Sequence, residues 1–273
     1  ISLCQDIQGQ TFDYPEEFFK ERIHSIRRPR PDNFQIKEAA EKIKKSKNPI
    51  IISGGGVFYS NAMEELSNFA IKHNIPVTQT VMGYSTMKRD HSHYAGQIGG
   101  LGGKNTNDLA KETDLAIAVG TKLADFTTGS WANFENENFK LLSINVSRFD
   151  ANKHLAQAVV GDAKVSLIEL SKALGDWKVG DEWNEKSQRE LKIWNEHIDK
   201  ESAPTNQEVP SYIQVIGAIY RNSEPTDIAV TAAGGLVGEV VQVWRPKELN
   251  THESEWGFSC MSYEISGALG IKM

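Results

Sequence analysis

The chain has 273 residues, with 30 Lys and Arg against 36 Asp and Glu, so its formal net charge is 30 − 36 = −6. No stretch approaches the roughly 18 apolar residues of a membrane helix, and the first residues lack the basic start and apolar core of a secretory signal. A negative balance without a long Lys/Arg run also gives no electrostatic footprint for nucleic acid. We therefore expect no membrane or nucleic-acid partner, and the two cysteines, Cys4 and Cys260, favour the reducing cytoplasm.

The N-terminal segment mixes aromatic and charged residues. Apolar side chains at Phe18, Phe19, Ile23 and Ile26 have the spacing of one amphipathic helix. Prolines follow this stretch closely and would end that helix. We therefore predict a single short helix before the first globular unit.

Helices and short apolar strands alternate over residues 36–175. The predicted strands cover residues 49–53, 76–80, 114–119, 141–146 and 158–161. The predicted helices cover residues 36–45, 61–73 (with Asn61 as N-cap), 107–112 and 163–174. Continuously apolar strands between helices are typical of a parallel sheet covered on both faces. Residues 36–175 are thus predicted to form a doubly wound α/β domain with a six-stranded parallel sheet.

The pattern changes after residue 175. Residues 176–206, with three tryptophans among charges and a predicted helix over 182–200, are interpreted as a connector. A second unit follows, for which the predicted elements are a helix over 211–222, a strand over 227–231, a glycine turn at Gly234 and Gly235, and a helix over 240–244. The chain stops inside an apolar segment without a cap and does not begin with Met, so we expect a piece of a longer protein.

Three loops are candidates for ligand binding: two follow predicted strands, and the third is a glycine cluster before a predicted helix. The glycines Gly54 and Gly56 fit a dinucleotide fingerprint, but its third position is Tyr59, so a tight strand-to-helix turn is favoured. The loop 99–103 permits either close approach to a ligand or simple mobility. The loop 125–130 follows a strand, and a hydrogen-bonded turn is slightly favoured there. All three loops are expected at the carboxyl edge of the sheet.

Other catalytic chemistries find little support. His91 and His93 lack further ligands for a metal, so no metal site is expected. No serine has glycine on both sides at the spacing of a hydrolase elbow. We interpret Cys260 as a buried apolar filler, since no basic residue adjoins it.

Two pairs of segments carry a family resemblance. Residues 119–126 (Val-Gly-Thr-Lys-Leu-Ala-Asp-Phe) and 160–163 resemble the central domain of thiamine-diphosphate-dependent enzymes of the acetohydroxyacid synthase group. Residues 231–235 and 257–264 resemble the start of the diphosphate-binding domain. The similarity is greatest to members that act on a cyclic dione in inositol breakdown, and it rests on residues 8–10, 125–130, 143–145, 149–154 and 260–264.

This resemblance implies an arrangement of domains and an activity. Residues 1–35 would be a linker from a missing pyrimidine-binding domain, 36–175 the central Rossmann-like domain, and 207–273 an incomplete diphosphate-binding domain. The intact enzyme would use thiamine diphosphate and Mg²⁺ to open the ring of a small cyclic dione to a deoxy-hexuronic acid, as a homodimer or homotetramer. The alternatives are an acetolactate-forming carboligase and a non-catalytic nucleotide-binding or scaffolding module.

The resemblance also assigns cofactor-binding residues. Ala233, Gly234, Gly235 and Leu236 match the loop that meets the diphosphate. Ser259 would offer its backbone carbonyl to the pyrimidine amino group. Met261 matches the apolar side chain wedged beneath the two cofactor rings, with a core methionine as the alternative.

Some parts that the family needs do not occur in this sequence. No Gly-Asp-Gly stretch is present to hold Mg²⁺, and the glutamate that activates the pyrimidine ring would lie outside the chain. We therefore expect no complete catalytic set and no metal ligands here, no activity of the chain alone, and no tight binding of thiamine diphosphate. Whether the central domain binds flavin or a nucleotide is left open.

Overall fold

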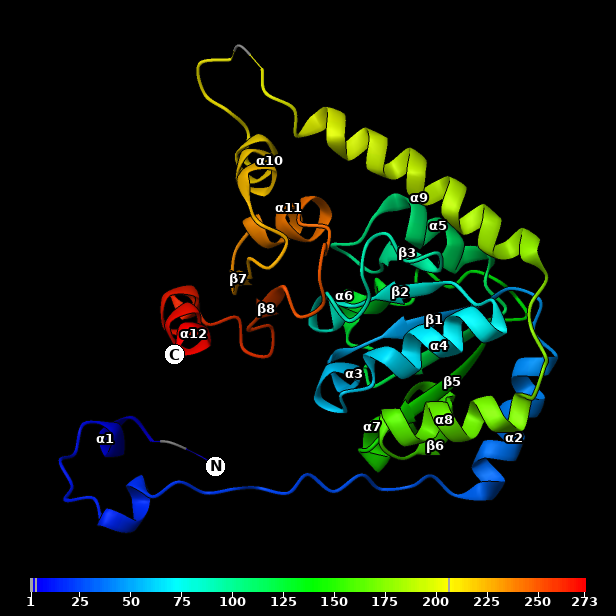
Figure 1. The fold of residues 1–273 in the computed structure, drawn as a ribbon, viewed down its shortest axis with the longest axis horizontal. Helices are drawn as coiled ribbons and strands as arrows, with labels where there is room; N and C mark the ends of the chain where they lie inside the picture. Colours follow the sequence, from blue (N-terminus) through cyan, green and yellow to red (C-terminus); the bar gives the residue numbers. More distant parts are fainter. Residues whose placement is uncertain (1, 3, 206) are drawn as a thin grey trace.

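The structure is a computed structural model that describes residues 2, 4–205 and 207–273. Two α/β units follow one another along the chain, and the long helix α9 (Asp181–Glu201) runs beside both of them (Figure 1). Within the described residues, no helix has both the length and the apolar character that a membrane crossing requires.

The first unit is built on a six-stranded parallel sheet, which confirms the predicted fold class. The strands are β1 (Pro49–Ser53), β2 (Val77–Gln79), β3 (Tyr94–Gln97), β4 (Leu115–Val119), β5 (Lys140–Asn145) and β6 (Gln157–Val160). Their order is β3-β2-β1-β4-β5-β6, and every neighbouring pair is parallel. The chain therefore winds outward from β1 to one edge and then returns to lie beside β1 again. β3 was not placed from the sequence, because Tyr-Ala-Gly-Gln lacks a β-branched run.

Helices cover both faces of this sheet (Figure 1). One layer holds α2 (Asn33–Lys44), α4 (Met63–His73) and α8 (Ala163–Leu174), in which α8 contacts both α2 and α4. In the other layer, α5 (Lys104–Glu112) packs against α9. Short helices follow three of the strands: α3 (Gly55–Tyr59), α6 (Asp125–Thr128) and α7 (Arg148–Ala151). The 3₁₀ turns are η1 (Glu16–Phe19), η2 (Val81–Gly83) and η3 (Lys153–Leu155).

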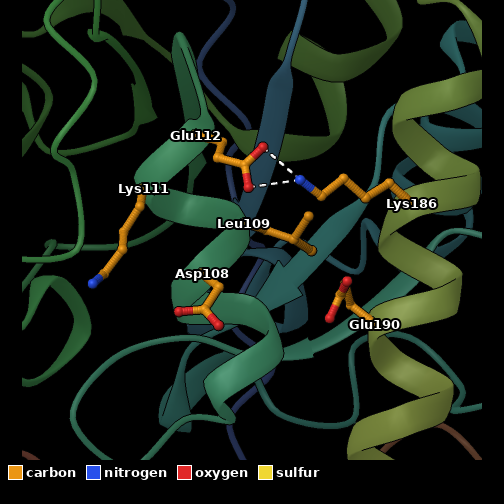
Figure 2. Close-up of a pocket in the computed structure, with 6 residues that line it drawn as sticks. All are labelled: Asp108, Leu109, Lys111, Glu112, Lys186 and Glu190. Carbon is orange, nitrogen blue, oxygen red and sulfur yellow. Dashed lines mark hydrogen bonds and ion pairs between the residues drawn. The ribbon is translucent and has the colours of Figure 1, made fainter.

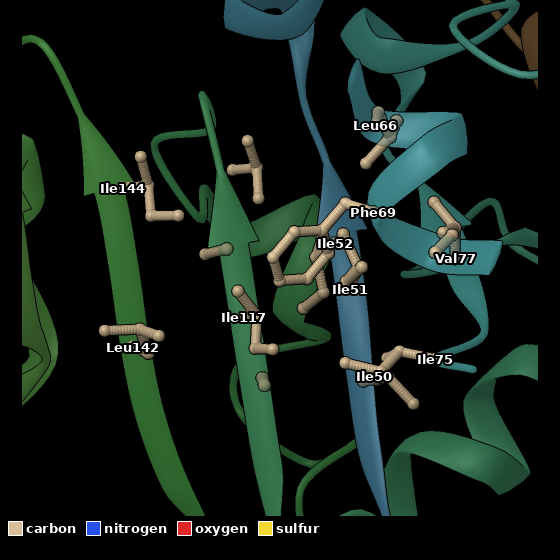
Figure 3. Packing of buried hydrophobic residues seen from close by; sticks show 14 of the residues in the cluster. Ile50, Ile51, Ile52, Leu66, Phe69, Ile75, Val77, Ile117, Leu142 and Ile144 are labelled. Atoms are coloured by element: carbon tan, nitrogen blue, oxygen red, sulfur yellow. The ribbon is translucent and has the colours of Figure 1, made fainter. Parts of the chain in front are cut away.

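The core lies between the central strands and the helix layers (Figure 3). Ile50, Ile51 and Ile52 of β1 are fully buried, as is Ile117 of β4. Phe69 of α4 reaches into the same cluster. Because β1 and β4 are covered on both faces, every residue along them can be apolar, which explains why their sequence runs do not alternate with polar residues.

The predicted amphipathic helix in the N-terminal segment is wrong. Over residues 14–26, only the short turn η1 forms, and Ile23 is 92% exposed. A short isolated helix has little stability without a surface to pack on. The side chains of Phe18, Phe19, Ile23 and Ile26 all stay exposed. The end of the segment is anchored instead, since Arg28 pairs with Asp162 at 3.0 Å and Asp162 donates its backbone N–H to Pro29 O at 2.9 Å.

The predicted N-cap at Asn61 is also wrong. α4 begins at Met63 with Ala62 before it, and Asn61 has a left-handed backbone with φ of +50°. The short helix α3, which the sequence pattern did not reveal, comes directly after β1 and ends at Tyr59. Asn61 lies in the turn between these two helices, where its tolerance of positive φ is useful.

Helix α9 contacts both units. Trp183 and Leu191 belong to the hydrophobic cluster of the first unit, and the Trp183 indole N–H donates to Pro49 O at 2.8 Å. Ile198, nearer its C-terminal end, belongs to the cluster of the second unit. Residues 176–206 therefore contain a packed helix, and the limits of the domains stay a prediction.

The second unit is small. It holds α10 (Tyr212–Asn222), β7 (Ala229–Thr231), α11 (Leu236–Val243), β8 (His252–Ser254) and α12 (Tyr263–Lys272). β7 and β8 pair in parallel, with Thr231 opposite Ser254. The last helix of the chain, α12, has no buried residue. The short helix α1 (Gln5–Gln8) lies far away in the N-terminal segment.

Candidate functional site

The first glycine turn of the central domain is closed by its own backbone. A Cβ atom added at Gly54 would lie under 3.0 Å from Gly120 O, and one at Gly56 would lie 2.6 Å from Gly120 Cα. The amide of Gly54 donates to Val119 O at 2.9 Å, and that of Gly56 donates to Gly120 O at 2.8 Å. These amides are therefore occupied, and the glycines allow two strand ends to approach each other. This supports the tight strand-to-helix turn over a dinucleotide site.

The loop 99–103 is held in a similar way. Gly99 has φ of +108°, and an added Cβ there would lie under 3.0 Å from Phe126 O. The amide of Gly100 donates to the same carbonyl at 2.7 Å, and the Asn107 side chain bonds both backbone groups of Gly99 at 3.0 Å. The loops 99–103 and 125–130 therefore meet at the carboxyl edge of the sheet, as predicted. Their contacts are made with each other.

A hydrogen-bonded turn is present at residues 125–130. The carboxylate of Asp125 accepts from Ser130 Oγ at 2.9 Å, and its carbonyl accepts from the Gly129 amide at 2.8 Å. The turn contains the short helix α6, which ends at Gly129 with a left-handed conformation. The structural interpretation of this motif is therefore sufficient to explain these polar residues.

The glycine turn of the second unit is open. Gly234 has φ of +101°, and neither Gly234 nor Gly235 has any atom within 4 Å of an added Cβ. Gly235 is the N-cap of α11 and no side chain caps this helix, while Leu236 at its first position is 44% exposed. Ala233 precedes the turn and is half-buried. Uncapped amides at a helix N-terminus with free space in front of them suit a phosphate group.

The second predicted contact region follows β8. Ser259 and Ser262 both have positive φ, and Met261 between them is 85% exposed. Glu255 shapes this turn, because its carboxylate accepts the amides of Phe258 and Cys260 at 2.7 Å each. The same two hydrogen bonds, with that from Cys260 the larger effect, lower the pKa of Glu255.

Both regions lie at one edge of the small sheet. β7 leads into the Gly234 turn and β8 leads into the Ser259 turn, and because the strands are parallel their carboxyl ends are neighbours. The amide of Glu255 donates to Thr231 O at 3.1 Å, which fixes this proximity directly. The residues predicted to meet the cofactor are thus gathered on one small unit.

One sequence interpretation in this region is wrong. Cys260 is exposed, so it is not a buried filler, and its backbone amide donates to the Glu255 carboxylate. For Met261, the exposed side chain does not fit the alternative of a core methionine, and its role at the cofactor stays a prediction. The sequence could not reveal the exposure of this turn, because Cys and Met are usually buried.

The joint between the two units contains polar residues that sequence reasoning missed. His252 of β8 is buried, lies 3.2 Å from Thr231 Oγ1 and meets the Tyr84 ring edge-on at 5.2 Å. Burial lowers the pKa of His252 to about 4. Nearby, Trp256 packs edge-on against Phe126 at 5.2 Å. β8 has the polar sequence His-Glu-Ser, so no hydrophobic pattern marked it as a strand.

His91 and His93 are used for local hydrogen bonds. His91 Nε2 lies 2.8 Å from Ser67 Oγ, and His93 Nε2 lies 3.0 Å from Asn74 Oδ1. In the part of the chain that the structure describes, no group of three or more His, Cys, Asp or Glu residues is placed to hold a metal ion.

One cavity lies between α5 and α9, far from the Gly234 turn in the sequence (Figure 2). It has a volume of about 390 Å³ and charged walls, and Lys186 bridges across to Glu112. None of the residues predicted to bind the cofactor lines it. The cavity is therefore separate from the candidate site.

The sequence of this chain is similar to those of known proteins. Residues 36–170 match the family described as thiamine pyrophosphate enzyme, central domain. Over the whole chain, the sequence is 39% identical to a 3D-(3,5/4)-trihydroxycyclohexane-1,2-dione hydrolase of Clostridium tetani. It is 37% identical to a protein of that name in Geobacillus thermodenitrificans and 36% identical to one in Bacillus anthracis, again over all of this chain.

The chain spans about half the length of these curated relatives, since it covers 46% of each. The matched segment contains all six strands of the central sheet. The family, the fold and the relatives therefore agree with the resemblance that the motifs carried. By sequence, residues 36–170 match the central domain of thiamine pyrophosphate enzymes.

Proposed function

We propose that this chain provides the central domain and part of the cofactor site of a thiamine-diphosphate-dependent hydrolase. The substrate would be 3D-trihydroxycyclohexane-1,2-dione, opened to 5-deoxy-glucuronate in myo-inositol breakdown. The observation that carries this proposal is the open turn at Gly234 and Gly235, set in a chain 36–39% identical over its whole length to relatives with that name.

The residues at the carboxyl edge of the small sheet fit the cofactor. A Cβ at Gly234 or Gly235 would fill free space, so the absence of side chains leaves the α11 amides accessible to a diphosphate. The carbonyl of Ser259 would accept from the pyrimidine amino group, and the exposed Met261 would support the two rings from below. When bound, thiamine diphosphate supplies a carbanion and an electron sink.

These residues bind and orient the cofactor, and they transfer no proton. The chain contains no Gly-Asp-Gly stretch to hold Mg²⁺ and offers no carboxylate assigned to the pyrimidine ring. The proposal therefore requires Mg²⁺ ligands and an activating glutamate from elsewhere in the intact protein. By itself the chain should neither hydrolyse the dione nor bind thiamine diphosphate tightly. Isothermal titration with Mg²⁺ tests this, and sub-micromolar binding, about −8 kcal/mol or better, would contradict it.

The substrate is tested with the intact protein. We expect the cyclic dione to give the ring-opened acid and pyruvate to give no acetolactate. Acetolactate as the main product would instead support the carboligase alternative. Gly234→Val should abolish turnover by blocking the diphosphate contact. Gly100→Ala should leave turnover unchanged, because its added Cβ would make only an ordinary contact with Phe126, at 3.7 Å.

The central domain is proposed to act without a flavin or nucleotide. The amides of Gly54 and Gly56 are already used by the backbone, so they cannot also meet a pyrophosphate. Flavin absorbance, or a nucleotide released from the purified protein by denaturation, would overturn this part of the proposal.

Assembly and location are also proposals. A homodimer or homotetramer of the intact protein is inferred from the family resemblance, and light scattering tests it. The two cysteines, Cys4 and Cys260, are exposed and free, which supports the cytoplasm. Fractionation of the source cells would decide that location.

A further inference from the structure

A second cavity lies at the opposite, amino-terminal edge of the central sheet. Its volume is about 380 Å³, and its walls come from the end of α2, the loop before β1, the start of β4 and the loop that enters β5. Four of its lining residues are lysines: Lys42, Lys45, Lys47 and Lys140. The Gly234 turn is not near this edge, because Gly238 of α11 lies beside Leu101 in a loop at the carboxyl edge: a Cβ added at Gly238 would be 3.5 Å from the Leu101 side chain.

The cavity has one acidic lining residue, Asp114, and its carboxylate is already engaged. It accepts from Ser46 Oγ, from the Lys47 amide at 2.8 Å and from the Asn48 amide at 3.1 Å. The formal charge of the lining is therefore 4 − 1 = +3, whereas the chain as a whole carries −6. The lining of this cavity is thus positively charged, although the chain as a whole is negatively charged.

The four lysines have no ion-pair partner among the residues that the structure describes. Burial and the neighbouring Lys140 lower the pKa of Lys42, in that order, and Glu38 on the same helix opposes them. Lys44 is close in sequence but does not line the cavity. Its ammonium group has an ion-pair partner, the Glu41 carboxylate at 3.4 Å. The ammonium groups of Lys42 and Lys140 therefore repel each other, and an anion between them would relieve that repulsion.

We propose that this cavity binds a small anion that carries at least two phosphate groups. Lysine ammonium groups act as point charges toward phosphate, and no arginine lines the cavity to form a bidentate pair with a lone carboxylate. The side chains of Asn136 and Asn138 add amide groups to the wall. The volume lies within the usual range of small-molecule sites, about 300–1,000 Å³. This site is independent of the proposed hydrolase activity.

Isothermal titration of the chain at low ionic strength tests the proposal, with inorganic pyrophosphate as the probe. We expect saturable binding with one pyrophosphate per chain, and at least tenfold weaker binding of inorganic phosphate and of citrate. Citrate binding as tight as pyrophosphate would overturn the assignment of phosphate groups, and no saturable binding would overturn the site.

Variants that remove lysine charges locate the pyrophosphate-binding site. Lys42→Gln combined with Lys140→Gln should weaken pyrophosphate at least tenfold, and Lys45→Gln with Lys47→Gln should also weaken it. The matched control Lys44→Gln removes one charge outside the cavity and should change affinity less than twofold. Gly234→Ala should also leave affinity unchanged, whereas loss in that variant alone would place the anion at the α11 turn and overturn the proposal.

A fold check accompanies these measurements. Without anion, the Lys42→Gln, Lys140→Gln variant should unfold at the same temperature as the parent chain or higher, because it relieves repulsion. Added pyrophosphate should raise the unfolding temperature of the parent chain but not that of the variant. An equal rise in both would contradict the site.

Discussion

The glycine turns of the two units have similar sequences and opposite surroundings. At Gly54 and Gly99 of the central domain, the space that a side chain would fill is taken by backbone from a neighbouring loop. At Gly234 and Gly235 of the second unit that space is empty. A glycine cluster therefore indicates only that something approaches the backbone closely, and the fold decides whether it is the protein itself or a ligand.

The largest difference in unfolding free energy should appear when a methyl group is added at Gly99 of the closed loop. Gly99→Ala combines a positive φ with a Cβ under 3.0 Å from Phe126 O, so it should lower the free energy of unfolding by at least about 3 kcal/mol. Urea denaturation measures this loss. The neighbouring Gly100→Ala has its nearest atom at 3.7 Å and should stay within about 0.5 kcal/mol of the parent. Equal effects of the two changes would mean that the loop is not closed.

Acid should weaken the second unit through His252. In the folded chain its pKa is about 4, below its ordinary value of 6.5, so folding keeps it neutral where the unfolded chain takes up a proton. Its stabilising contribution is complete above pH 6.5 and is lost as pH falls toward 4, by up to about 3 kcal/mol. Unfolding followed between pH 7 and pH 4 measures this slope. His252→Gln should reduce the slope, and an unchanged slope in this variant would contradict the prediction.

The open turn should tolerate a methyl group far better than the closed one. Gly234→Ala carries only the cost of a positive φ, about 1 to 2 kcal/mol, since no atom opposes its Cβ. Gly235 has φ of −68°, so Gly235→Ala should stay within about 1 kcal/mol of the parent, on the stabilising side. Chemical denaturation distinguishes the two. A loss at Gly234 as large as that at Gly99 would show that the turn is packed.

The smallest effect on stability is expected at Met261. Because this side chain is 85% exposed, Met261→Ala should change the unfolding free energy of this chain by less than about 0.5 kcal/mol. The buried Met87 is the matched control, and Met87→Ala should cost about 2 to 5 kcal/mol. In the intact protein, Met261→Ala should lower turnover at least roughly tenfold, about 1.4 kcal/mol of barrier. Unchanged turnover would remove Met261 from the cofactor site.

The sequence predicted the parts of the fold that hydrophobic patterns encode. β1 and α8 were placed at their observed limits, because both combine a clear apolar run with turn or cap residues. β3 and β8 were not found, since Gly96 weakens one pattern and polar residues fill the other. Their pairing depends on neighbours far away in the chain, which no local window contains.

The candidate site was predictable only in part. Motifs selected Gly234, Ser259 and Met261, but the sequence did not reveal that parallel pairing of β7 and β8 brings the two turns to one edge. It also gave the wrong environment for Cys260, because residue type predicts average burial and not the burial of one particular turn.

Helix α9 has a consequence for the order in which the chain acquires its structure during synthesis. It is a rod of 21 residues, about 30 Å long. Trp183 and Leu191 can settle on the central domain as soon as the sheet exists, whereas Ile198 has to wait for α10 and α11 to emerge. In the growing chain, the first half of α9 should therefore pack on the central domain while its second half is still exposed. The core of the second unit can then form on that exposed half.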